Sequence, residues 1–74
     1  MPDMADSRST EALKAQATAL LMRRVPDSVL SGPAELARRY RENAAILSRF
    51  LAGEVPTYRA AEAARVLHHA QVRT

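Results

Sequence analysis

The fold of this chain of 74 residues is decided by the stretch Leu36-Ala37-Arg38-Arg39-Tyr40-Arg41-Glu42-Asn43-Ala44-Ala45-Ile46-Leu47-Ser48-Arg49-Phe50-Leu51-Ala52-Gly53. No proline interrupts it, and its apolar residues recur at helical spacing. Two structures can use this pattern. In the first, one long amphipathic helix presents an apolar stripe that would pack in a helical hairpin or a coiled coil. The residues of that stripe are Leu36, Tyr40, Leu47 and Leu51.

In the second structure, the stretch breaks near Arg41–Asn43 into two helices. Asn43 would then cap the second helix by accepting a hydrogen bond from one of its free N–H groups. Small residues on the outward side of that helix would allow a close approach to the floor of a DNA groove, where Ser48 and Arg49 can hydrogen-bond base edges. The residues that we expect to read DNA bases are Asn43, Ala44, Ala45, Ser48 and Arg49.

The flanking sequence supplies the ends of the helices. Ser31-Gly32-Pro33 is typical of a helix start, and Gly53 followed by Pro56 is typical of a helix end. A last helix is expected over about 57–71. Upstream, Ser9 or Thr10 is expected to cap a helix that ends before Val25-Pro26, and residues 1–8 are expected to form a disordered tail. The sequence thus predicts an all-α bundle of four or five short helices that contains a helix-turn-helix.

The charge balance suggests a polyanionic partner. Eleven Lys and Arg residues against eight acids leave a net charge of +3, and all but one of the cations are Arg. Arginine contacts phosphate through a planar fork of donors, which suits it to nucleic acid. We therefore expect Arg38, Arg39 and Arg41 to contact DNA phosphates, although the same cluster could simply be the solvated face of a helix.

The composition argues against other classes of function. The chain is too short for a full catalytic domain with a substrate cleft, so we expect no enzymatic activity and no cofactor. It has no Cys, and its adjacent His68 and His69 would point about 100° apart on a helix, so no metal site is expected. No apolar run approaches the roughly 18 residues that span a bilayer, and the first residues do not read as a signal peptide. We expect a cytoplasmic protein with no membrane contact.

The stretch from Leu36 to Gly53 resembles the helix-turn-helix of the phage-repressor family, which includes lambda repressor and Cro. In that family a Leu-Ala pair lies in the first helix of the motif, a polar residue caps the recognition helix, and a glycine ends it. The likeness covers residues 31–68, and it departs at Arg41, where the family usually has glycine, and at Glu42, where it usually has an apolar residue. The resemblance implies a single DNA-binding domain over residues 9–74 with the motif at about 34–52, and it adds Arg59 as a phosphate contact.

Together these features predict a small sequence-specific transcriptional regulator of the phage, plasmid or antitoxin type, such as a repressor. Its recognition helix would lie in the major groove of double-stranded DNA, and a homodimer would place two such helices about 34 Å apart. Two alternatives stay open. One is a helical protein-interaction module, such as a chaperone, an adaptor or an antitoxin, whose apolar stripe meets a partner helix. The other is a ribbon–helix–helix repressor, which would need residues 18–25 to form a strand.

Overall fold

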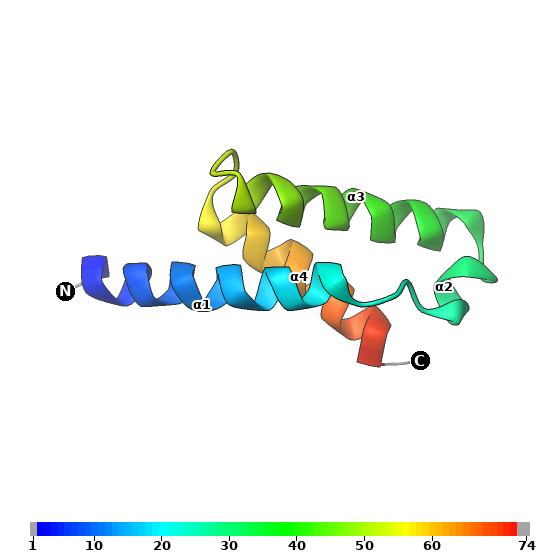
Figure 1. Ribbon diagram of the computed structural model, residues 1–74. Coiled ribbons are helices and arrows are strands. Elements are labelled where there is room, and N and C mark those ends of the chain that lie inside the picture. The colour runs from blue at the N-terminus through cyan, green and yellow to red at the C-terminus, as the bar shows by residue number, and fades with distance from the viewer. Residues whose placement is uncertain (1, 73–74) are drawn as a thin grey trace.

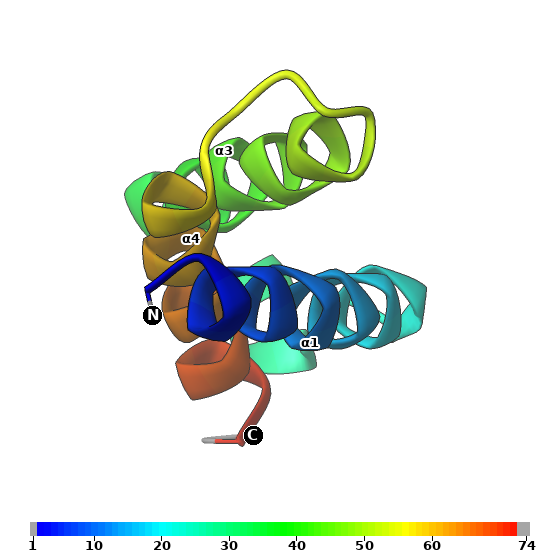
Figure 2. The same cartoon turned by 90° about the vertical axis from the view of Figure 1, so that its left-hand side faces the viewer.

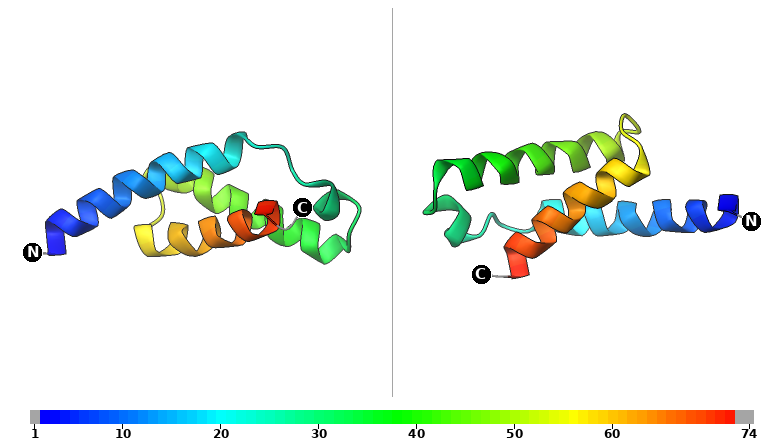
Figure 3. Two further views of the ribbon diagram at one scale, coloured as in Figure 1. Left: turned by 90° about the horizontal axis from the view of Figure 1, so that it is seen from below. Right: turned by 180° about the vertical axis from the view of Figure 1, so that it is seen from behind.

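The computed structural model of this protein describes residues 2–72, with side chains from residue 9 onward. Four helices make up this part of the chain, and no strand occurs in it: α1 (Pro2–Met22), α2 (Asp27–Leu30), α3 (Ala34–Leu51) and α4 (Thr57–Val72). The prediction of a small all-α bundle is therefore confirmed. Helices α1 and α3 lie side by side, and α4 crosses both of them obliquely on one face (Figures 1 and 2). The N-terminal part of α1 extends beyond the body of the bundle (Figure 3).

A single apolar core holds the three longer helices together. Its buried residues come from all four helices, and no polar or charged side chain among the described residues is buried with them. Helix α4 contributes mainly alanines, which have no long side chain and so let its backbone pack closely against α1 and α3. The buried core residues are Leu13, Ala17, Leu20, Val29, Tyr40, Leu47, Phe50, Ala60, Ala63, Ala64 and Leu67.

The connections between helices follow the expected turn chemistry. Pro26 and Pro33 both have extended backbones just before α2 and α3 (ψ 144° in each), so each chain segment changes direction before a helix begins. Gly53 adopts a left-handed conformation, with φ at +81°, directly after the C-cap of α3. Its N–H donates to the carbonyl of Phe50, and the N–H of Glu54 donates to the carbonyl of Arg49. This pair of bonds is a Schellman motif, and it confirms Gly53 as the residue that closes the helix.

The predicted break at Arg41–Asn43 is wrong, because α3 runs without interruption from Ala34 to Leu51. Asn43 does not cap a second helix: its Nδ2 donates to the carbonyl oxygen of Arg39, four residues earlier, at 2.7 Å. No residue other than glycine has a positive φ in the described chain, so Arg41 does not form the left-handed turn that the resemblance requires. The continuous helix is favoured because Tyr40 and Leu47, two turns apart, face the same core. The helix-turn-helix at about 34–52 is therefore absent.

Two other expectations about the N-terminal half need correction. Helix α1 begins at Pro2, so the tail predicted for residues 1–8 is helical from its second residue. Proline is favoured at the first position of a helix, because its missing N–H would have no partner within the helix there. The strand over residues 18–25 that a ribbon–helix–helix fold needs is also absent, because residues 18–22 belong to α1. Residues 73 and 74, at the end of the predicted domain, lie outside the described chain.

Hydrogen bonds join α4 to the other helices near both of its ends. Near its start, the hydroxyl groups of Thr10 and Thr57 lie 3.0 Å apart, so Thr10 links α1 to α4 instead of capping a helix. Near its end, Nε2 of Gln71 donates both to the carbonyl of Leu20 (3.0 Å) and to the hydroxyl of Tyr40 (2.8 Å). Because these bonds reach α1 and α3 from one side chain, they connect the C-terminal part of α4 to both helices.

Candidate functional site

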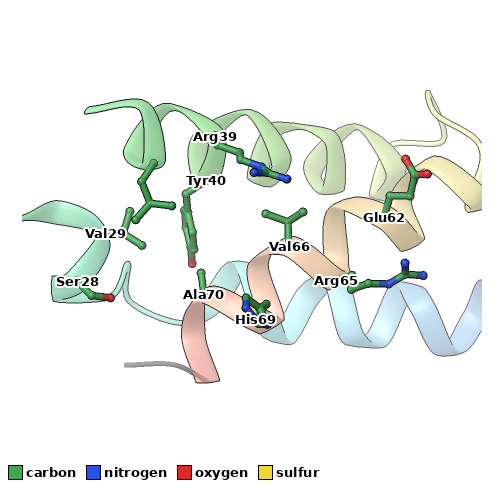
Figure 4. Close-up of a pocket in the computed structure, with 10 residues that line it drawn as sticks. Ser28, Val29, Arg39, Tyr40, Glu62, Arg65, Val66, His69 and Ala70 are labelled. Atoms are coloured by element: carbon green, nitrogen blue, oxygen red, sulfur yellow. The ribbon is translucent and has the colours of Figure 1, made fainter. Parts of the chain in front are cut away.

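A groove opens on the surface between α2, α3 and α4, with a volume of about 830 Å³ (Figure 4). Helix α2 forms one end of it, and facing turns of α3 and α4 form its two walls. Its lining is mainly apolar with a few charged side chains at the edge. The residues that line it are Ser28, Val29, Leu36, Arg39, Tyr40, Glu62, Arg65, Val66, His69 and Ala70.

The floor of the groove is built partly by residues of the apolar core. Val29 and Tyr40 are buried, whereas Val66 and Ala70 are half-buried and face the groove. Leu36 is the exception, because 42% of its surface is exposed at the groove wall. An apolar floor that continues into an exposed leucine is the kind of surface that binds a partner's apolar side chains.

Gly32 sets the position of Leu36 relative to α2. A Cβ atom at position 32 would lie only 2.6 Å from the carbonyl oxygen of Ser28 and 3.5 Å from Cδ2 of Leu36. Only glycine allows the corner between α2 and α3 to close this tightly. As a result, the first turn of α3 lies against α2, and Leu36 lies at the mouth of the groove.

The rim of the groove carries two arginines on opposite walls. Arg39 extends from α3 toward α4, and Arg65 extends from α4 (Figure 4). Neither forms an ion pair with any other residue whose side chain the structure describes. Glu62, one turn before Arg65, is the single acid in the lining, and His69 completes the rim. The rim therefore carries more positive than negative charge.

The structure separates the arginines that the sequence grouped as phosphate contacts. Successive residues of an α-helix are about 100° apart, so Arg39 and Arg41 point to nearly opposite sides of α3. Arg39 lines the groove, whereas Arg41 is exposed outside it. Arg38 is exposed and lies 3.9 Å from carboxylate oxygens of both Glu35 and Glu42. Arg59 is exposed in the first turn of α4.

The predicted base-reading residues are likewise divided between two environments. Asn43 and Ala44 are half-buried, and the Asn43 amide is bonded to its own helix. Ala45, Ser48 and Arg49 are exposed. With Arg38 they form an outward stripe along α3, where α3 faces away from the core. The structure thus brings part of the predicted set onto one surface and leaves the rest against the bundle.

Other kinds of site find no support among the described residues. His68 and His69 are both exposed on α4, and no group of three or more His, Cys, Asp or Glu side chains in the described chain could hold a metal ion. None of the helices in residues 2–72 combines the length and the apolarity that crossing a membrane requires.

Sequence reasoning missed most of the groove. The α4 wall, with Glu62, Arg65 and Val66, was predicted only as part of a last helix, and Leu36 was placed on an apolar stripe whose packing partner was left open. The available signal was the spacing of Glu62, Val66 and Ala70, which lie one turn apart on a side of α4 next to its alanine-rich core face. The walls of the groove come from segments that are distant in sequence, so only the fold brings them together.

Comparisons of this chain with protein-family models, with curated proteins and with solved structures find no match.

Proposed function

We propose that this protein is a helical protein-interaction module that binds an amphipathic helix of a partner protein in the groove between α2, α3 and α4. The observation that carries the proposal is the apolar floor of Val29, Tyr40, Val66 and Ala70, which continues into the exposed side chain of Leu36. A partner helix with apolar residues at i, i+4 and i+7 would place them along this floor. Burying the exposed part of Leu36 would then contribute to the free energy of binding.

The unbroken α3 favours this function over reading of DNA by a helix-turn-helix. In a helix-turn-helix the recognition helix starts at a turn, so that its first residues reach the base edges. Here the residues from Arg41 to Asn43 continue the helix, and Asn43 is bonded to Arg39 within it. What supports a protein partner instead is that the same unbroken helix forms a wall of the groove.

An NMR titration tests the proposed function. The probe is an uncharged amphipathic helical peptide with leucines at i, i+4 and i+7 and with alanine and glutamine elsewhere. We expect its addition to shift the amide resonances of Val29, Leu36, Tyr40 and Val66. Leu36→Glu should weaken binding by tenfold or more, which is about 1.4 kcal/mol, because a charged side chain would stand at the apolar mouth of the groove.

Leu51→Glu is the matched control for this experiment. Leu51 lies on the same helix and is 39% exposed, close to the 42% of Leu36, but it does not line the groove. The control should bind the peptide as the unmodified protein does. An equal loss of binding in both variants, or peptide-induced shifts that lie outside the groove, would contradict the proposed function.

Double-stranded DNA is a second candidate ligand, favoured by the outward stripe of α3. Arg38 and Arg49 lie on this stripe with the small Ala45 between them, and Ser48 lies at its edge. For this function, the affinity for a short labelled duplex should fall steeply as salt rises, since phosphate contacts release counterions. Arg49→Ala should weaken that binding more than Arg23→Ala, which removes an exposed arginine after α1. Equal effects of the two substitutions would remove the stripe as a DNA-binding surface.

A further inference from the structure

We infer that the helix bound in the groove is acidic along both edges of its apolar face. This inference rests on the proposed function and specifies the chemistry of the partner. The basis is the placement of Arg39 on the α3 wall and Arg65 on the α4 wall, with the apolar floor between them. A helix lying on that floor presents one flank to each wall, so each flank comes close to one arginine.

Both arginines keep their charges available for a partner. The ion pairs among the described side chains involve Lys14 and Arg38, and neither Arg39 nor Arg65 takes part in one. Arg38 shows the contrast, since it lies within 3.9 Å of two glutamates of its own helix. A carboxylate is the group that matches the planar fork of a guanidinium, with two parallel N–H···O bonds. Arg39 and Arg65 are therefore the natural partners of Asp or Glu on a bound helix.

The position of Glu62 further defines where acidic residues are expected on the bound helix. It is the one acid that lines the groove, and it lies one turn before Arg65 on the same wall. An acidic side chain on the partner would be repelled next to Glu62 and attracted next to Arg65 and Arg39. The partner's acids are thus expected toward the end of the groove near Arg39 and Arg65, and a neutral or basic residue is expected opposite Glu62.

The gain in affinity that ion pairs with Arg39 and Arg65 can give is limited, because the rim of the groove is exposed to solvent. Exposed ion pairs contribute little individually and are screened by salt. Two such pairs acting together are expected to raise affinity by on the order of tenfold at low ionic strength, and by much less at high ionic strength. Apolar contacts with the floor should respond weakly to the same change in salt.

The test compares three peptides that share one apolar face and differ only at the flanking positions, which carry glutamate, glutamine or lysine. Affinities are measured by fluorescence anisotropy at low and high salt. The glutamate peptide should bind on the order of tenfold more tightly than the glutamine peptide at low salt, and the lysine peptide should bind most weakly. The Arg39→Gln/Arg65→Gln double variant should bring the ratio between the glutamate and glutamine peptides close to one.

The control is the Arg41→Gln/Arg49→Gln double variant, which removes the same charge from exposed positions of α3 outside the groove. It should keep the preference for the glutamate peptide. Equal affinity for all three peptides would overturn the acidic partner while leaving the groove as a docking site. If none of the three peptides binds, the proposed function itself is overturned. An equal loss of preference in both double variants would show a general effect of net charge and would overturn the roles of Arg39 and Arg65.

Discussion

Leu47→Ala is expected to lower the free energy of unfolding by about 2–5 kcal/mol. The Leu47 side chain is completely buried, and with Leu67 it is one of the largest side chains so enclosed. Removing most of it would lose the transfer free energy of the deleted groups and leave a cavity among closely packed neighbours. A domain of this size has a total stability on the order of 4–11 kcal/mol. The loss is therefore a large fraction of the total stability, and the variant should unfold at a clearly lower urea concentration than the unmodified protein.

Urea unfolding followed by circular dichroism at 222 nm would measure this loss. Leu51→Ala provides the comparison, because it makes the same chemical change four residues later on the same helix, where 39% of the residue is exposed. Its cost should be smaller, about 1 kcal/mol, since part of the deleted side chain already contacts solvent in the folded state and its removal leaves no enclosed cavity. Equal losses in the two variants would mean that the face of α3 in the core is not the one described above.

Glu42→Pro is expected to cost about 3 kcal/mol or more. The Glu42 side chain is exposed, so the cost comes from the backbone: proline has no N–H to donate to the carbonyl of Arg38, and its ring collides with that carbonyl. The substitution falls inside the segment that a helix-turn-helix would use as its turn. In a turn of that kind, proline would cost far less than in the middle of a continuous helix.

Ala34→Pro is the matched control for this substitution. Ala34 is the first residue of α3, where the N–H has no partner within the helix, and the preceding Pro33 already has the extended backbone that a following proline requires. The control should change the free energy of unfolding by less than about 0.5 kcal/mol. A thermal or urea unfolding series on the two variants gives the comparison, and a mild effect of Glu42→Pro would contradict an unbroken α3.

Helix ends were largely predictable from the sequence, because single residues determine them. Pro33 can begin a helix but cannot continue one, and Gly53 supplies the left-handed residue that closes α3. The core face of α4 was also predictable, since its alanines and Leu67 recur at helical spacing. These features depend on local chemistry, which is present in the sequence itself.

The break in α3 was predicted wrongly because Asn43 has two local uses. Its side chain can cap a new helix, or it can hydrogen-bond a carbonyl four residues earlier within one helix. The sequence contains both options, and the choice depends on whether packing favours a single stripe through Tyr40 and Leu47. That packing comes from α1 and α4, so it cannot be seen in the stretch from Leu36 to Gly53 alone.

The groove could not be predicted from the sequence, because it too depends on how the helices pack against one another. Leu36, Val66 and the buried Tyr40 are unremarkable apolar residues when each helix is considered separately. They come together in one groove only because α4 crosses α3 at an angle that leaves its alanine-rich face buried and its Val66 side toward α2 and α3. Gln71, which bonds to both Leu20 and Tyr40, connects α4 to α1 and α3.

The α3 wall of the groove and the absence of a helix-turn-helix both depend on α3 being one continuous helix. The decisive measurement is the set of ¹³Cα secondary chemical shifts over residues 34–51 in solution. We expect helical values at every position, including Arg41, Glu42 and Asn43. Values typical of a turn at these three residues, with helical values on either side, would contradict the account and restore DNA reading by a recognition helix as the leading function.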